Sequence, residues 1–347
     1  MPNCTGGRAA IAAAQLLTLL FVAPAHGQPA LPCTAPNRID WPAQAPVWSL
    51  CWVAPNVSSG VDGSGLELRH VFYKGKRVFW RAHLPLLNVK YDPGGCGGSY
   101  LSYRDWANGL VRFEATNVIA PGYSEPTSAP RTVCDTPGAD VGSFTGVAAE
   151  KLVDRLILTT QLSAGWYRYI MKWTFFLDGT VLPQFGFSAV THPCTSKPHT
   201  HHAYWRFDFD VNGAADDAVQ QASTPCWSTL PKELSLKRSA GPGACWIWRV
   251  LDKPTGLGYE IQPGPSDGIA DTWAGADSWA LRYHGAEIDD GGATTGALGD
   301  AQHLGQYENG EPIDGTDVVV WYHVSVRHDA GLMCETAGPT LKPIRPW

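Results

Sequence analysis

The sequence predicts a mostly β protein, built as one large antiparallel β-sandwich with few short helices. Runs of β-branched and aromatic residues, several of them with period-2 alternation, recur along the chain. Turn formers are abundant, with 37 Gly and 27 Pro in 347 residues, and 15 Trp supply large side chains for an apolar interior. Helical periodicity is scarce, so layered sheets are expected.

The strand-like runs follow one another along the chain. They are LELRHVFYKGKRVFWRAHL (66–84), EKLVDRLILTTQL (150–162), YRYIMKWTFFLDGTVLPQFGF (167–187) and DVVVWYHVSVRH (317–328). Within them, YKGKR and FLDGT are typical of hairpin turns. The best short helix candidate is AADDAVQQA, Ala214–Ala222.

The first residues predict export. Arg8 precedes the apolar run Ile11–Ala25, which ends in small residues, and this order is typical of a secretory signal over residues 1–27. The alternative is an uncleaved N-terminal anchor, although the run is short for a spanning helix. Residues 28–347 are then expected to form a single domain, secreted or periplasmic, with no membrane association after cleavage.

Eight of the nine cysteines remain after residue 27, and an even number in an exported chain predicts disulfides. Eight cysteines allow about 105 pairings, so the connectivity is open. Short-range pairing would give Cys33–Cys51, Cys96–Cys134 and Cys226–Cys245, leaving Cys194 with Cys334.

The charge argues against two classes of partner. Without the signal, 25 Lys and Arg stand against 32 acidic residues, a net charge of −7. A negative chain is a poor ligand for nucleic acid or for an anionic membrane.

The segment KPHTHHAYWRFDFDVNG (197–213) concentrates candidate ligands. On a strand, His199 and His201 point to one face and His202 to the other. Two imidazoles at this spacing form half of a metal site, and a solvated histidine-rich turn is the competing interpretation.

The acids that follow do not form an EF-hand loop. Asp208 and Asp210 match its start, but the twelfth position is Val219 rather than Glu. Alternation with phenylalanines indicates a strand, whose acids could hold an ion with help from another strand. The string GPSDG (264–268) matches a nucleophile elbow only in letters, and its flanking prolines favour a plain turn.

Three separated segments resemble one family, the copper amine oxidases, which use a quinone cofactor. GWYRYIMKWTFFLDGTVLPQFGF (165–187) is similar to the strand that carries the modified tyrosine, and HTHHAYWRFDFDVNG (199–213) to the H-x-H segment. DVVVWYHVSVRHDAG with GPTLKPIRPW (317–347) is similar to the near-terminal strand ending on a third histidine. NVKYDPG (88–94) and SYRDW (102–106) resemble upstream motifs, so the resemblance covers most of residues 47–347.

The resemblance implies a secreted enzyme that converts primary amines, O₂ and water to aldehyde, ammonia and hydrogen peroxide. It implies that His199, His201 and His328 ligate Cu(II), whose preference for nitrogen donors suits three imidazoles. It also implies a homodimer.

The resemblance assigns four further residues. Tyr167 would be the precursor of trihydroxyphenylalanine quinone, Asp105 the general base, Tyr103 a gate and Tyr91 a hydrogen-bond partner of the quinone. For the tyrosines, a core role is the usual alternative in an aromatic-rich protein. For Asp105 the alternative is a solvated loop acid.

A peripheral calcium-type site is implied as well, and oxygen ligands suit such a hard cation. Solvated acids at strand ends are the alternative. Its ligands would be Asp208, the carbonyl of Phe209, Asp210, Asp317 and the carbonyl of Val318.

The sequence departs from the family around Tyr167. Trp166 replaces an asparagine and Arg168 an acid, and on a regular strand both would face away from Tyr167. These departures leave open a quinone-less copper-binding relative, acting as a binding protein or another copper oxidase. A secreted structural module with incidental histidines is the third hypothesis.

Overall fold

The computed structural model describes residues 30–54, 57–59, 65–94, 96, 102–104 (backbone only), 122–136, 138–139, 147–222, 227–238, 247–271, 274–285, 304–329 and 334–347. The expected signal over residues 1–27 lies outside this part of the chain.

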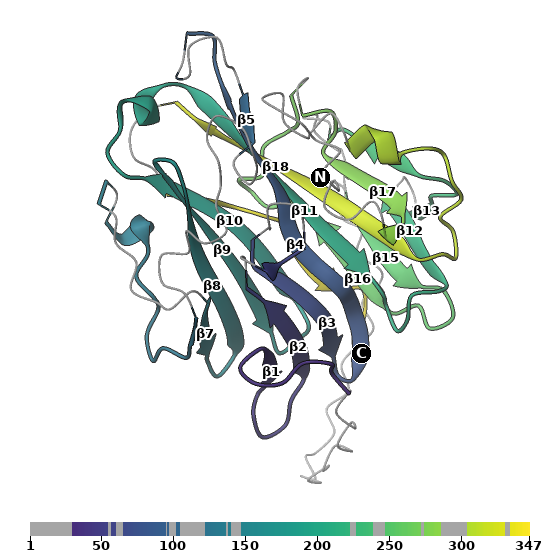
Figure 1. Ribbon diagram of the computed structural model, residues 1–347. Helices are drawn as coiled ribbons and strands as arrows, with labels where there is room; N and C mark the ends of the chain where they lie inside the picture. The colour runs from purple at the N-terminus through teal and green to yellow at the C-terminus, as the bar shows by residue number, and fades with distance from the viewer. Residues whose placement is uncertain are drawn as a thin grey trace, which may run out of the picture.

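Two sheets form a β-sandwich, which confirms the predicted fold class (Figure 1). The first sheet has nine strands, in the order β1 (Arg38–Trp41), β2 (Trp48–Val53), β3 (Glu67–Tyr73), β4 (Lys76–Tyr91), β11 (His199–Phe209), β18 (Val318–His328), β17 (Ser278–Arg282) and β14 (Leu234–Leu236), with β5 (Ser102–Arg104) paired to β4.

The second sheet has eleven strands and is antiparallel except for its last pair, β6 and β7. Its order is β13 (Trp227–Thr229), β12 (Asp217–Ala222), β15 (Trp248–Asp252), β16 (Gly258–Gln262), β20 (Thr340–Pro343), β10 (Val181–Ala189), β9 (Tyr167–Phe176), β8 (Arg155–Ala164), β7 (Val147–Lys151) and β6 (Tyr123–Ser124), with β19 (Glu335–Ala337) paired to β10. The 3₁₀ turns whose bounds lie within the described residues are η2 (Val133–Asp135), η3 (Pro193–Ser196) and η5 (Leu304–Tyr307).

Local turn chemistry produces the two expected hairpins. Lys74 and Gly75 join β3 to β4, both with positive φ (48° and 77°), which matches the right-handed twist of paired strands. Residues 177–180 join β9 to β10.

The expected helix Ala214–Ala222 is wrong. Its second half is the strand β12, which pairs with β15 from Asp217 opposite Asp252 to Gln221 opposite Trp248. Local helix propensity is a weak preference, and ladder pairing with packing on a sheet overrides it here.

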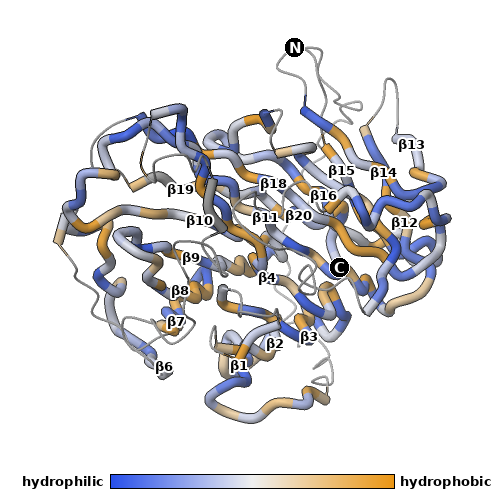
Figure 2. The backbone as a smooth tube through the Cα atoms, turned by 45° about the horizontal axis from the view of Figure 1, so that its top comes forward, coloured by the Kyte–Doolittle hydropathy of each residue, from blue (hydrophilic) through white to orange (hydrophobic). Residues whose placement is uncertain are grey.

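The main core fills the space between the two sheets. Alternate residues of β11 and β9 meet there, with Trp205 and Trp173 in edge-to-face contact at 5.1 Å between ring centroids. Hydrophobic and hydrophilic stretches alternate along the strands accordingly (Figure 2).

A second apolar layer covers the outer face of the first sheet. Leu86, Tyr204 and Trp321 on that face pack against Trp279 and Tyr307, and the whole cluster is buried. The central strands are therefore buried on both faces, which explains the near-continuous apolar run of β18.

Strands β11 and β18 pair without interruption over eleven residues. The ladder runs from His199 opposite His328 to Phe209 opposite Val318. At one end, the residues that follow β11 therefore lie beside those that precede β18. At the other end, the residues that precede β11 lie beside those that follow β18.

The disulfides agree only in part with short-range pairing. Cys33–Cys51 is present as expected. Cys96 bonds Cys194 and Cys134 bonds Cys334, so the expected Cys96–Cys134 and Cys194–Cys334 pairs are wrong. The reason is that strand pairing brings together segments far apart in sequence. Cys226 and Cys245 lie outside the described residues.

Trp205→Ala is expected to lower the free energy of unfolding by about 3–5 kcal/mol, because it empties a fully buried inter-sheet site. Denaturant unfolding measures this, with Trp80→Ala, at a half-buried site on β4, as the control. Equal losses for the two variants would contradict the assignment of the core.

Candidate metal centre

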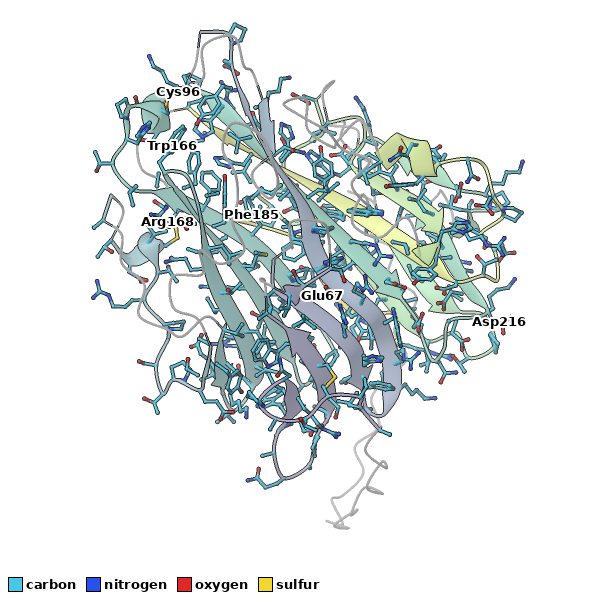
Figure 3. All side chains as sticks on the ribbon, viewed as in Figure 1. Glu67, Cys96, Trp166, Arg168, Phe185 and Asp216 are labelled. Atoms are coloured by element: carbon cyan, nitrogen blue, oxygen red, sulfur yellow. A yellow bond between two sulfur atoms is a disulfide. The ribbon has the colours of Figure 1, made fainter. Side chains whose placement is uncertain are left out.

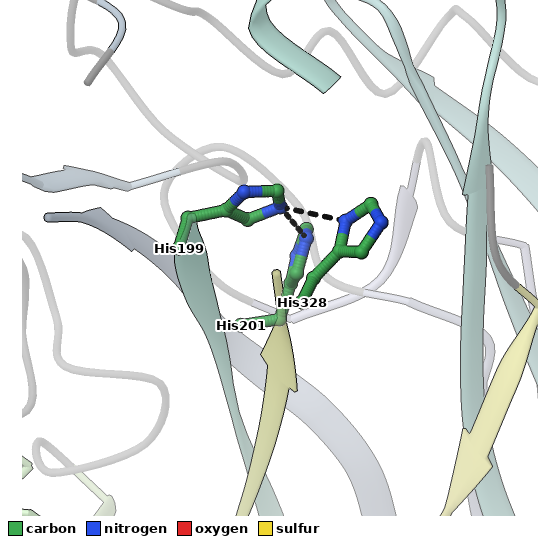
Figure 4. A group of neighbouring side chains, drawn as sticks. All are labelled: His199, His201 and His328. Atoms are coloured by element: carbon green, nitrogen blue, oxygen red, sulfur yellow. Dashed lines mark hydrogen bonds between the residues drawn. The ribbon is translucent and has the colours of Figure 1, made fainter. Parts of the chain in front are cut away.

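Three histidines converge between the sheets at one end of the β11–β18 ladder (Figure 4). His199 and His201 alternate on the inner face of β11, as predicted, and His328 lies directly across on β18. Nε2 of His199 lies 3.0 Å from Nε2 of His201 and 3.1 Å from Nδ1 of His328. All three side chains are buried.

The environment keeps the imidazoles of His199 and His201 neutral. Burial lowers the pKa of His199 to about 4, and burial together with the neighbouring imidazoles holds the pKa of His201 well below its usual value. His199 Nδ1 lies 2.5 Å from the carbonyl of Lys197 and donates its proton there, so Nε2 carries a lone pair toward the other rings.

This arrangement fits a transition-metal ion. Two nitrogens bound to one ion at about 2.0–2.1 Å lie about 2.8–3.4 Å apart at bond angles between 90° and 110°. The two separations in the structure fall within that interval. Because two facing lone pairs would repel, nitrogens this close share either a proton or a cation.

Tyr167 reaches the cluster from the opposite sheet. It is the first residue of β9, and its hydroxyl lies 2.7 Å from Nε2 of His199, the nitrogen that faces the other rings. Tyr91, in register with His199 on β4, places its hydroxyl 3.2 Å from that of Tyr167. The structure thus brings two of the three tyrosines named from the sequence, Tyr167 and Tyr91, to the histidines.

The second tyrosine of WYRY, Tyr169, also faces the cluster but meets it differently. Its hydroxyl lies 3.3 Å from Nδ1 of His201, the nitrogen turned away from the other two rings. The sequence reasoning did not single out Tyr169, although its i+2 spacing from Tyr167 on a strand places it on the same face.

The two departures around Tyr167 have different outcomes (Figure 3). Arg168 turns away from the cluster and donates hydrogen bonds to the carbonyls of Gly165 and Tyr167. Trp166 does not face away as predicted, because it lies in the turn before β9 rather than on a regular strand. Its ring stacks on His192 at 4.1 Å and packs against the small cluster of Val89 and Tyr91.

His202 points to the opposite face of β11, as predicted, but it is not solvated. It is fully buried, with Nδ1 3.0 Å from Nε2 of His323. Tyr204, a member of the apolar layer on this face, lies against the ring of His323 with ring centroids 4.6 Å apart, and the ring of His323 stacks on that of His202.

Two residues assigned from the sequence cannot be placed at the cluster. Asp105 lies outside the described residues. Tyr103 belongs to β5, whose backbone pairs with β4 opposite Val89.

A second group of candidate ligands, two buried and one half-buried, lies at the far end of the same ladder. Carboxylate oxygens of Asp208, Asp210 and Asp317 lie within 4.8 Å of one another. Phe209 and Val318, whose carbonyls were assigned to this site, pair with each other beside these acids.

Burial of like charges perturbs this acidic group. Burial raises the pKa of Asp208 to about 6 and that of Asp317 to about 7, and nearby carboxylates add to the shift of Asp317. Asp217 is affected most, since burial and the carboxylates of Asp210 and Asp252 raise its pKa to about 9. Asp217 was missed in the sequence because its segment was assigned to a helix.

Among the described residues, no helix has the length and apolar character needed to span a membrane.

Neither a protein-family model nor a curated protein matches this sequence. Solved structures do share its fold. The chain is similar to the Pichia pastoris lysyl oxidase, with 16% identity, a TM-score of 0.61, and 86% of this chain covering 51% of that one.

A copper-containing benzylamine oxidase from Hansenula polymorpha gives 16% identity and a TM-score of 0.63 over 89% of this chain and 59% of that one. An Aspergillus nidulans amine oxidase gives 16% and 0.56 over 86% and 50%. The chain therefore spans about half the length of these structures. At such identities, the likeness shows the β-sandwich fold that they share with this chain.

In metal-free protein, stability is expected to fall as pH rises from 7 to 8.5. An unfolded aspartate titrates near pH 3.9, whereas Asp217 titrates at about 9 when folded, so the folded state alone holds the proton in this range. Asp217→Asn should flatten the decline, which thermal unfolding in a chelating buffer would measure.

The control is Asp154→Asn, at an exposed turn. A decline in Asp217→Asn as steep as in the wild type would show that this carboxyl is not the group that titrates.

Proposed function

We propose that the chain is a copper-dependent amine oxidase that converts primary amines, O₂ and water to aldehyde, ammonia and hydrogen peroxide. One observation carries the proposal. The hydroxyl of Tyr167 lies 2.7 Å from the inward nitrogen of His199, inside a buried cluster of three imidazoles. A phenol in this position is adjacent to any ion that the three imidazoles hold.

The histidines are proposed to hold Cu(II). They are nitrogen donors, and Cu(II) favours nitrogen and oxygen donors. The fold shared with copper-containing and other amine oxidases supports this choice of metal. The outer nitrogen Nδ1 of His199 would donate its proton to the carbonyl of Lys197, and Nδ1 of His201 would contact the hydroxyl of Tyr169.

Tyr167 rather than Tyr169 is proposed as the precursor of trihydroxyphenylalanine quinone. Tyr167 contacts the inward nitrogen of a histidine, whereas Tyr169 contacts an outward nitrogen and is separated from the centre by the ring of His201. When present, the quinone supplies the carbonyl that accepts a primary amine. Tyr91 would hold the oxygen of residue 167 in place through its hydroxyl.

Proton abstraction is proposed for Asp105, with Tyr103 as a gate beside the amine. A carboxylate in a dry site can act as a base near neutral pH because desolvation raises its pKa. Both assignments rest on the resemblance of SYRDW to the family motif.

The second candidate function is copper binding without a quinone. It is favoured by Trp166, whose ring packs against Tyr91 next to the tyrosine that has to be modified. A bulky neighbour could block the ring rotations that modification requires.

The acidic group is proposed as a calcium-type site, with Asp208, Asp210 and Asp317 as ligands and the carbonyls of Phe209 and Val318 completing it. A hard cation suits an all-oxygen donor set. A bound cation would also offset the burial and the mutual repulsion that raise the carboxyl pKa values, so added Ca²⁺ should reduce the pH dependence of stability.

Export to an oxidising compartment and assembly as a homodimer are also proposed. Three disulfides among the described residues support the first, because disulfides persist in such compartments. The second rests on the resemblance alone.

Purified protein is expected to bind one Cu(II) at the histidine cluster with high affinity. His328→Ala removes one of three donors and should lower the copper content of dialysed protein at least tenfold, as measured by elemental analysis. The control is His323→Ala, which alters a buried histidine on the other face of the same strand. Unchanged copper in His328→Ala would refute the assigned ligand.

Copper-loaded wild type exposed to O₂ is expected to give a quinone signal, and Tyr167→Phe is expected to abolish it. Redox-cycling stain and phenylhydrazine absorbance report the cofactor, while Tyr169→Phe should retain a signal whenever copper is bound. Stoichiometric copper without any quinone in the wild type would reject the oxidase and favour the quinone-less binding protein.

A further inference from the structure

We propose that Tyr169 is a positioning residue for the metal centre, which fixes the tautomer and orientation of His201 through its hydroxyl. The inference rests on the proposed metal site and adds to it the residue that prepares one of its ligands.

The first step concerns the ring of His201. Phe187 stacks on it with ring centroids 3.7 Å apart and an interplanar angle of 29°. Phe187 is also in register with Tyr169 across β9 and β10. The stack sets the plane of the imidazole but leaves open which of its nitrogens carries the proton.

The second step concerns that proton. A neutral imidazole binds a metal through its unprotonated nitrogen, so a ligand bound through Nε2 needs its proton on Nδ1. Nδ1 of His201 lies 3.3 Å from the hydroxyl oxygen of Tyr169, which can accept this proton as a hydrogen bond. Nε2 then presents its lone pair to Nε2 of His199, 3.0 Å away.

The third step is a comparison with His199. That ring has the same requirement and meets it with a backbone acceptor, the carbonyl of Lys197, at 2.5 Å. His201 is the third residue of β11, where the strand is already paired on both sides, with β4 and with β18. A side chain from the facing sheet therefore supplies the acceptor, and Tyr169 is fully buried in position to do so.

Tyr169→Phe removes the hydroxyl and keeps the ring. Loss of the hydrogen-bond partner of a metal-binding histidine typically weakens metal affinity by about 10- to 100-fold. We expect the copper dissociation constant, measured by competition with a chelator, to rise by that factor. The electron paramagnetic resonance spectrum of the Cu(II)-loaded variant is expected to show altered nitrogen coupling.

The matched control is Tyr259→Phe. Tyr259 is equally buried and donates its hydroxyl to the carbonyl of Gly179, and its ring contacts are with Phe79 and Trp347 rather than with the histidines. Copper affinity should stay at the wild-type value in this variant. Equal weakening in both variants would overturn the inference, as would wild-type affinity in Tyr169→Phe.

A measurement on wild type loaded with the diamagnetic ion Zn²⁺ tests the inference without a variant. Nitrogen NMR of the imidazoles is expected to show His201 protonated on Nδ1, and protonation on Nε2 would overturn the proposed role. Wild type that binds neither copper nor Zn²⁺ would instead reject the proposed metal centre, and with it the inference that rests on it.

Discussion

The uninterrupted ladder between β11 and β18 is the constraint on which both candidate sites depend. With His199 opposite His328 and Phe209 opposite Val318, one pairing places the imidazoles at one end and the carboxylates at the other. The two ends are about 30 Å apart, from the rise of a strand per residue. A slip of one residue would turn each inner side chain outward and dismantle both groups at once.

The second sheet contributes what the ladder cannot. Tyr167 and Tyr169 stand two residues apart on β9, so both enter the same space and meet different atoms of the cluster. The sandwich excludes water there, which lowers the pKa of His199 and keeps its Nε2 lone pair available to bind a metal ion. A sheet surface open to solvent would favour protonated imidazoles and lose the site at mildly acidic pH.

The predictable part of this protein is the part encoded locally. The alternation of side chains along residues 199–209 predicted that His199 and His201 share one face, and the Lys74-Gly75 pair predicted the hairpin between β3 and β4. Trp166 was misplaced because a face rule for strands does not apply in a turn. The burial of His202 depends on a covering layer from remote segments, and such contacts leave no periodic trace in sequence. Disulfide partners are subject to the same limit.

The disulfide map has a consequence for the order in which the chain is made. Cys96 and Cys134 are both synthesised before either of their partners, which follow 98 and 200 residues later. During that interval, Cys96 and Cys134 are each other's nearest available thiols along the sequence, and thiol–disulfide exchange can form a non-native disulfide between them. Correct cross-linking therefore depends on the arrival of Cys334, near the end of the chain. Biosynthesis of this protein thus has to keep early thiols reduced, or reshuffle them, until translation is nearly complete.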